Sequence, residues 1–349
     1  TGRVVVNRFW AQIFGTGLVK TLEDFGSQSE WPSHPELLDW LAREVVDGGW
    51  NVKALLKLIV LSATYRQSSA VKPLDREIVE PGSAVKLLNR EGVESGISSG
   101  SSQRFNASTV QRFDDSTLQR LNLLTRDPEN RLLARGPRVR LPAELIRDQA
   151  LAVSGLLALR VGGPSVYPYQ PEKLYEGIVV GADYPGTRWG NSTGEDLHRR
   201  SLYTFWKRTM PHPAMTGFDS PDREFCTVRR SRTNTPLQAL TLWNEPGYLE
   251  AARQLGTRML REGGADDDAR VAFAFRLATG RRPAARETRV LTTALARLRA
   301  DFVAHGDDAY AFVKVGASPL DATLAPAELA AATAVANMIL SLDETITKN

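Results

Sequence analysis

The sequence contains a single cysteine, Cys226, and only four histidines among its 349 residues. One cysteine cannot form a disulfide within the chain, and it excludes the cysteine-rich ligand sets that hold a structural zinc ion. None of the four histidines has a second histidine or a cysteine at the spacing of a metal-ligand motif. The sequence therefore predicts neither a disulfide-stapled scaffold nor a metal site.

Long hydrophobic runs are also lacking. The longest uncharged stretch, residues 329–342, is rich in alanine and leucine and falls short of the roughly 20 residues that a membrane-spanning helix needs. We expect it to be a closely packed core helix, and we expect no direct insertion into a membrane.

Several catalytic signatures are missing as well. There is no P-loop, no H-E-x-x-H zinc motif and no C-x-x-C-H haem attachment motif. The motifs therefore assign no catalytic residue, and no cofactor is expected within this stretch of chain.

Charge is distributed unevenly. The 44 basic and 40 acidic residues give a net charge of +4. Residues 196–232 contain eight basic and four acidic groups and so account for a net +4 by themselves. This density is far below that of a nucleic-acid-binding face, and no nucleic-acid partner is predicted. With 42% apolar residues the chain is too hydrophobic to be disordered throughout.

Helical periodicity dominates the readable segments. Val52, Leu55, Leu56, Ile59 and Val60 recur at the spacing of one helix face. An S-x-x-E capping box, with Ser33 as N-cap and Glu36 at the third helical position, predicts the start of a preceding helix. Two such helices with a short turn form a hairpin. The valines at positions 4–6 resemble a strand.

Later segments give similar signals. Thr235 and Pro236 predict an N-cap and first helical position, and Pro246 predicts a break or kink. Three acids at 266–268 suit the start of another helix. Residues 201–207 alternate like a short strand. The predicted fold is mainly α, an irregular helical domain with helix hairpins, long structured loops and at most one or two short strands.

The chain divides by composition into three parts. Residues 1–71 are predicted as an N-terminal helical block, and residues 126–349 as a helical core that continues the same domain. Between them, residues 72–125 are rich in Ser, Gly and Asn and contain three copies of an eight-residue repeat. Such a tract buries little apolar surface, so it is predicted to be a disordered low-complexity insertion. Because the chain lacks an initial Met and enters an apolar stretch directly, it is interpreted as a piece of a longer protein.

The densest polar constellation spans residues 198–238. Arginine side chains near a helix N-terminus at Thr235 can bind a carboxylate, phosphate or sulfate in a bidentate manner. The residues predicted for such an anion site are Arg199, Arg200, His212, Arg223, Arg229, Arg230, Arg232 and Asn234.

Two other interpretations of this segment remain open. Asp219 and Asp222 could act as an acid and base pair, or His212 could activate Cys226. Alternatively, arginine–acid pairs and caps simply tie a long irregular segment to the helices. A second arginine cluster at 126–147 is nearly balanced by acids, which favours ion pairs on helix surfaces.

Seven separated blocks of the chain resemble one family. They are VNRFWAQIFGTGLVKTLEDFGSQSEWPSHPELLDWLA, LIVLSATYRQSS, DPENRLLAR, AELIRDQALAVSG, RRSLYTFWKR, CTVRRSRTNTPLQALTLWNEP and SLDETI. Together they are similar to the Planctomycete-specific domain of unknown function at the C-terminal end of large exported proteins, which commonly carry a c-type haem domain upstream. The resemblance covers nearly the whole chain apart from residues 72–125.

The resemblance implies a context and no reaction. It implies an exported parent, periplasmic or on the cell surface, with haem c only in an upstream domain, and a genomic setting of sulfatases and polysaccharide degradation. We expect a non-catalytic interaction or anionic-ligand-binding module whose partners are the upstream domains of its parent and an anionic glycan. The alternative is a hydrolase that acts on anionic polysaccharide with residues of the 198–238 segment.

Overall fold

The computed structural model describes residues 1–349 except 68, 70–124, 172–173, 175–188, 209 and 349. Within this part the chain is mainly α-helical, as predicted, and its one sheet pairs β1 (Val139–Arg140) with β2 (Thr347–Lys348). The chain forms two compact units, Thr1–Val139 and Arg140–Lys348. The predicted insertion at 72–125 lies outside the described residues apart from Thr125, so its nature stays a prediction.

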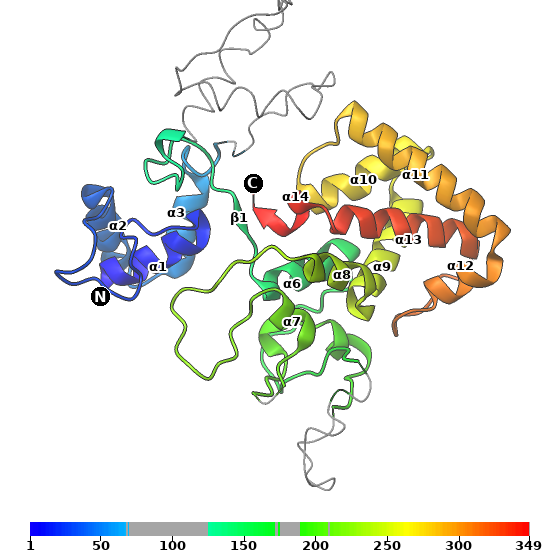
Figure 1. The fold of residues 1–349 in the computed structure, drawn as a ribbon, viewed down its shortest axis with the longest axis horizontal. Coiled ribbons are helices and arrows are strands. Elements are labelled where there is room, and N and C mark those ends of the chain that lie inside the picture. The colour runs from blue at the N-terminus through cyan, green and yellow to red at the C-terminus, as the bar shows by residue number, and fades with distance from the viewer. Residues whose placement is uncertain (68, 70–124, 172–173, 175–188, 209, 349) are drawn as a thin grey trace, which may run out of the picture. The chain divides into compact units, whose positions relative to one another are not determined.

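The helices that the structure describes in the first half of this unit are α1 (Gly2–Phe14), α2 (Pro35–Asp47) and α3 (Val52–Leu61) (Figure 1). Val6, Trp10 and Phe14 of α1 are buried in one hydrophobic cluster. Their spacing of four residues places them on one helix face. The strand-like interpretation of residues 4–6 is therefore wrong, because packing of this face outweighs the strand propensity of valine.

The second and third helices bury the predicted apolar faces. Leu38 and Leu41 of α2 and Leu55 and Ile59 of α3 join the same cluster. The predicted cap of α2 is wrong by one residue, since His34 is the N-cap and its side chain makes no capping bond. The Ser33 hydroxyl instead donates to the Leu18 carbonyl at 3.3 Å. A tertiary partner has thus taken the hydroxyl that local sequence assigns to the helix.

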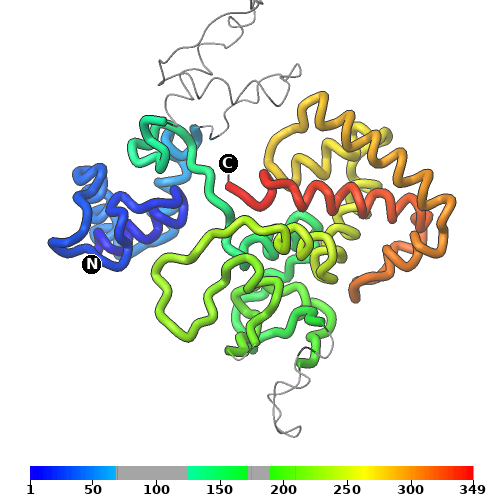
Figure 2. The backbone as a smooth tube through the Cα atoms, in the orientation of Figure 1, coloured from blue at the N-terminus to red at the C-terminus, as the bar shows by residue number. Residues whose placement is uncertain are grey.

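The second unit is a helical assembly around α13 (Figure 2). The strand β2 ends this unit. The helices described in the second unit, two of them the 3-10 helices η3 and η4, are α6 (Ala143–Ser154), η3 (Gly194–His198), η4 (Ser201–Tyr203), α7 (Pro213–Gly217), α8 (Pro236–Asn244), α9 (Pro246–Glu262), α10 (Asp267–Thr279), α11 (Ala285–Ala304), α12 (Gly306–Val313), α13 (Pro326–Leu340) and α14 (Asp343–Ile346).

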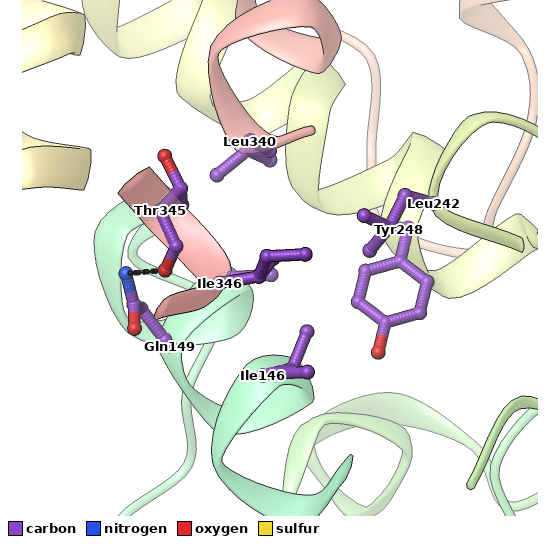
Figure 3. A pocket seen from close by; sticks show the side chains of 8 residues that line it. Ile146, Gln149, Leu242, Tyr248, Leu340, Thr345 and Ile346 are labelled. Carbon is purple, nitrogen blue, oxygen red and sulfur yellow. Dashed lines mark hydrogen bonds between the residues drawn. The ribbon is translucent and has the colours of Figure 1, made fainter. Parts of the chain in front are cut away.

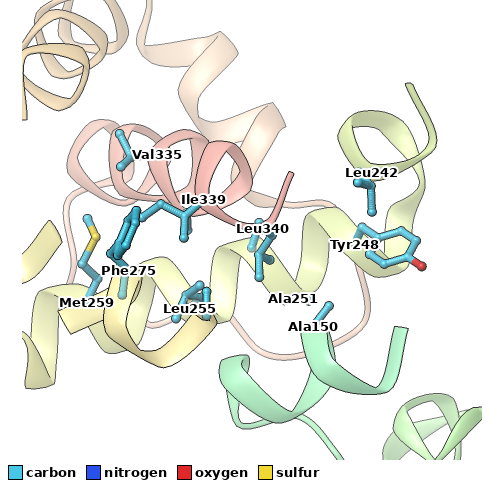
Figure 4. Close-up of a cluster of buried hydrophobic side chains, with 14 of the residues drawn as sticks. Ala150, Leu242, Tyr248, Ala251, Leu255, Met259, Phe275, Val335, Ile339 and Leu340 are labelled. Carbon is cyan, nitrogen blue, oxygen red and sulfur yellow. The ribbon is translucent and has the colours of Figure 1, made fainter. Parts of the chain in front are cut away.

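The core of this unit forms where α9, α10 and α13 meet. Leu255 and Met259 of α9, Phe275 of α10 and Ile339 of α13 point into one hydrophobic cluster (Figure 4). The predicted core helix at 329–342 is confirmed as α13, whose residues are almost all buried. Small side chains let α9 and α13 approach closely, because a Cβ on Gly256 would lie 2.9 Å from the Thr333 nitrogen. No helix of the described residues combines the length and the apolar character that crossing a membrane requires.

Local sequence signals set the helix ends around α8, α9 and α10. Thr235 is the N-cap of α8 with Pro236 at its first position, and the Gln238 side chain accepts from the Thr235 nitrogen at 3.4 Å. The predicted break at Pro246 is confirmed, because Pro246 is the first residue of α9. Asp266 caps α10 by accepting from the Ala269 nitrogen at 2.8 Å.

The predicted strand at 201–207 is wrong. Residues 201–203 form the 3-10 helix η4, and only an isolated parallel bridge joins Thr204 to Val166. Here the Val166 nitrogen donates to the Tyr203 carbonyl and the Phe205 nitrogen donates to the Val166 carbonyl, each at 2.8 Å. The alternation of apolar residues does not produce a strand, since no strand among the described residues continues this ladder.

Candidate functional site

The residues predicted for an anion site fall into two structurally different groups. Arg199 and His212 lie in the protein interior, whereas the arginines after residue 222 lie at the surface. Arg200 is also exposed but precedes that stretch, and its Nε lies 4.0 Å from the Asp148 carboxylate of α6. The structure therefore separates predicted site residues that belong to one segment of the sequence, residues 198–238.

Arg199 is only 1% exposed, and its two terminal nitrogens donate to carbonyls within the protein. Its guanidinium donates to the backbone carbonyls of Pro164, at 3.0 Å, and Gly162. Its Cζ also lies 3.9 Å from the centre of the Tyr203 ring. This arginine fastens a loop to η4 and is not available to a ligand.

His212 is buried at the start of α7. Its Nε2 lies 2.8 Å from the Tyr169 carbonyl, which can only accept, so Nε2 carries the proton. Among the described residues its Nδ1 has no hydrogen-bond partner. Burial, together with the positive charge of Arg147, lowers the pKa of His212 to about 4. The ring is neutral at physiological pH and cannot attract an anion by its charge.

The surface group forms one continuous stretch, residues 222–234, which we call the arginine segment. It leaves the helices after α7 as an open loop and returns into α8 (Figures 1 and 2). Every residue of the arginine segment is exposed. Five of the predicted site residues lie in it: Arg223, Arg229, Arg230, Arg232 and Asn234.

Two contacts hold the first half of the arginine segment. The Trp206 indole nitrogen donates to the Asp222 carbonyl at 2.9 Å, and the Arg223 Cζ lies 4.4 Å from the centre of a Trp206 ring. Farther along, Arg230 donates to the Glu144 carboxylate of α6 at 2.7 Å. Arg223 and Arg230 are therefore engaged by the protein itself.

The second half is held by Asp219, a residue with left-handed backbone geometry at φ 60°. Its carboxylate accepts from both the nitrogen and the hydroxyl of Thr233, each at 2.8 Å, and from the Arg140 guanidinium. Arg140 also donates to the Gln238 side chain at 2.7 Å. Burial opposes ionisation of Asp219, but the bonds from Thr233 and Arg140 outweigh it and lower its pKa.

Arg229 and Arg232 are the arginines that these anchors leave unpaired. Within the part of the chain that the structure describes, neither forms a salt bridge to a carboxylate. Partial burial lowers the pKa of Arg232, and the neighbouring charges of Arg140 and Arg229 lower it further. Within the described residues, Arg229 and Arg232 thus carry positive charge that no carboxylate of the arginine segment pairs with.

The catalytic alternative is not supported by this geometry. His212 binds a backbone carbonyl, and Asp219 is occupied by Arg140 and Thr233. Asp222 accepts from the Glu224 nitrogen at 3.0 Å, and Cys226 is exposed. Across the described residues none of these four side chains hydrogen-bonds to another, so no nucleophile–base or acid–base pair is assembled from them.

The sequence patterns did not predict the buried ionic network around Glu250. Glu250 of α9 is fully buried, and its carboxylate lies 3.0 Å from both the His198 Nε2 and the Tyr169 hydroxyl. The Ser318 nitrogen donates to it at 2.6 Å. Burial opposes ionisation, but these partners prevail and lower the pKa of Glu250 to about 2. The one signal that could have indicated a buried carboxylate is the position of Glu250 on the buried face of α9, beside Ala251.

Two arginines of the second cluster also differ from prediction. Arg147 does not form a helix-surface ion pair, because it donates to the carbonyls of Leu197, at 2.6 Å, and Arg199, at 2.9 Å. Arg140 pairs with Asp219, which is distant in sequence, and not with an acid of its own cluster. Both corrections have one reason: long guanidinium side chains reach partners on other elements.

A small cavity lies between α6, α8, α9, α13 and α14 (Figure 3). Its lining is mainly aliphatic, and the Gln149 side chain is held by the Thr345 carbonyl at 2.9 Å. None of its lining residues is charged. The cavity is therefore packing space in the core and offers no catalytic group.

Comparison with protein-family models finds a match over most of the chain. A family model, PSD1, described as "Protein of unknown function (DUF1553)", matches residues 1–94 and 102–295. No curated protein and no solved structure matches the chain.

Among the described residues no group of three or more His, Cys, Asp or Glu side chains is placed to hold a metal ion.

Proposed function

The chain belongs to the PSD1 family of proteins of unknown function, and we propose that it acts as a non-catalytic module that binds oxyanions through the arginine segment. Arg229 and Arg232 are the residues that contact the anion in this proposal. The observation that carries it is that both are exposed and lack an acidic partner among the described residues, while Arg140 beside them is neutralised by Asp219.

Electrostatics supports this role. Like charges held together raise the free energy of the free protein, and an anion placed among them removes that repulsion. The guanidinium group offers planar, bidentate hydrogen bonding to carboxylate, sulfate and phosphate. Because Trp206, Glu144 and Asp219 fix the segment at three points, less conformational entropy is lost on binding.

The proposal is tested by titrating the full chain with a sulfated heparin oligosaccharide and with inorganic sulfate in a calorimeter. Arg229→Ala and Arg232→Ala are each expected to weaken oligosaccharide binding by about tenfold, and to lower its salt dependence. Arg289→Ala, which removes an exposed arginine of α11, is the matched control. Equal affinity of all three variants and the original chain would remove the anion site.

The wider setting is part of the same proposal. The resemblance of seven sequence blocks supports a place at the C-terminal end of a larger exported protein with an upstream c-type haem domain, in a context of sulfated polysaccharide use. Purification of the parent protein from periplasmic and surface fractions, followed by haem staining of the intact polypeptide, tests this. A cytoplasmic parent without bound haem would contradict it.

A further inference from the structure

Helix α8 follows the arginine segment directly and carries apolar side chains on two sides. Gln238 and Leu242 are buried on the inner side. On the outer side Leu237 is 68% exposed, Leu240 54% and Trp243 38%. Their spacing of three residues aligns them along one side of the helix. We call these three residues the α8 stripe.

A helix that is apolar on both sides is normally covered on both sides. Two further apolar side chains, Phe225 and Val228, are exposed in the arginine segment itself. Exposed apolar side chains gathered in one region mark an interaction site more often than isolated ones do. The α8 stripe is therefore surface that a partner would cover.

The α8 stripe adjoins the cationic cluster. Gln238 in the first turn of α8 accepts from Arg140 at 2.7 Å, and its amide donates to the Gly217 carbonyl at 3.0 Å. Arg140 also donates to the carbonyl of Thr233, the residue after Arg232. Arg140 thus contacts the first turn of α8, where Leu237 begins the stripe, and the chain runs from the arginine segment into α8 within two residues.

We propose that the α8 stripe and the arginine segment together dock a partner protein segment that presents apolar side chains flanked by Asp or Glu. The inference rests on the proposed anion-binding function and names the source of the anion. Charge complementarity selects an acidic partner. Leucine and phenylalanine select a protein over a glycan, because their aliphatic and aromatic surface is buried best against other apolar side chains. Aromatic residues and arginine are also the residues enriched in protein interfaces.

Three synthetic helical peptides of roughly 18 residues, about five turns, serve as probes. The first carries a leucine stripe flanked by glutamates, the second replaces the leucines by serine, and the third replaces the glutamates by lysine. Binding to the full chain is measured by calorimetry, and protection of residues 222–244 by hydrogen exchange. The first peptide is expected to bind at least about tenfold more tightly than either of the others.

Variants separate the two proposals. Leu240→Ser is expected to weaken the first peptide about tenfold while leaving heparin oligosaccharide affinity unchanged. Arg232→Ala is expected to weaken both ligands. Val303→Ser, at an exposed position of α11, is the matched control for the loss of surface apolar area. Because Leu240 is exposed, its replacement leaves the fold intact, which a thermal melt verifies.

Each other outcome has a defined meaning. Equal binding of the first and second peptides, with no effect of Leu240→Ser, overturns the docking inference and leaves the anion site standing. Heparin binding without peptide binding identifies a glycan ligand and also overturns it. Self-association in sedimentation that Leu240→Ser abolishes overturns the inference as well, because the stripe is then covered by a second copy of the chain. Failure of every ligand to bind removes both proposals.

Discussion

The Arg140 guanidinium donates to the Asp219 carboxylate and so links β1 to the residue that holds the end of the arginine segment. Asp219 in turn accepts twice from Thr233. The exposed arginines are therefore positioned by a pair that is itself largely buried. The shape of the proposed site depends on this pair as much as on the arginines that would contact a ligand.

Replacing Arg140 is expected to loosen the arginine segment. Arg140→Ala leaves the Asp219 carboxylate without its cationic partner, at a cost of about 1–3 kcal/mol. Limited proteolysis should then cut within residues 222–234, and hydrogen exchange should rise there while α9 amides stay protected. The control is Arg160→Ala, which breaks an exposed pair with Asp196 and should cost less than about 1 kcal/mol. Unchanged protease resistance in Arg140→Ala would contradict the anchoring role.

Mild acid is expected to destabilise the second unit through His212. The pKa of His212 is about 4 when folded and near 6.5 when unfolded, so the unfolded state binds the proton more readily. Its stabilising contribution is complete above pH 6.5 and is lost as the pH falls toward 4, by about 3 kcal/mol in total.

Urea unfolding at pH 7, 6, 5 and 4.5 measures the effect of His212. His212→Gln, whose amide can donate to the Tyr169 carbonyl as Nε2 does, should be less stable at pH 7 and should show a flatter profile between pH 6.5 and 4.5. A variant with the same pH dependence as the original chain would refute the assignment.

Glu250 is expected to matter at lower pH. Its folded pKa of about 2 lies below the ordinary range, so its contribution is present above about pH 4.3 and is lost as the pH falls toward 2. Glu250→Gln should lower stability at pH 7 by about 2–3 kcal/mol, because charge-assisted bonds to His198, Tyr169 and Ser318 are weakened. Unfolding experiments compare it with Glu262→Gln, whose carboxylate pairs with Arg258 on the surface of α9. Equal effects of the two replacements would argue against a special role for Glu250.

Gly256→Ala is expected to destabilise the core. In an open helix, alanine in place of glycine stabilises by about 1 kcal/mol. At Gly256 the new Cβ would lie 2.9 Å from the Thr333 nitrogen and 3.0 Å from the Ala332 carbonyl carbon, so α9 and α13 must separate at a cost of about 1–3 kcal/mol. Gly306→Ala, where nothing lies within 4 Å, is the control and should be neutral or stabilising. Thermal melts that rank the two variants in the opposite order would disprove the close approach.

Sequence patterns and structure agree best where the cause is local. The capped start of α8, the break at Pro246 and the acid-rich start of α10 follow from residues within one helical turn. They disagree where a distant partner intervenes. Ser33 bonds Leu18 and does not cap α2, and residues 201–207 pair with no strand in the part of the chain that the structure describes.

The candidate site shows the same difference between what local sequence reveals and what distant partners decide. The sequence shows a concentration of arginines between residues 198 and 238, because charge density is readable from composition. It could not distinguish Arg199, which is surrounded by carbonyls, from Arg232, which is exposed. Nor could it predict Glu250, whose partners come from three segments remote in sequence.

The sequence by itself determined the helical fold class, the core helix α13 and the family to which the chain belongs. Periodicity, caps and family motifs are properties of neighbouring residues, so they need no knowledge of the fold. Only the tertiary structure decided which charges are used internally and which face outward. The physical reason is that a guanidinium or carboxylate takes its role from the groups that surround it, and for Arg140 the carboxylate of Asp219 is 79 positions away along the chain.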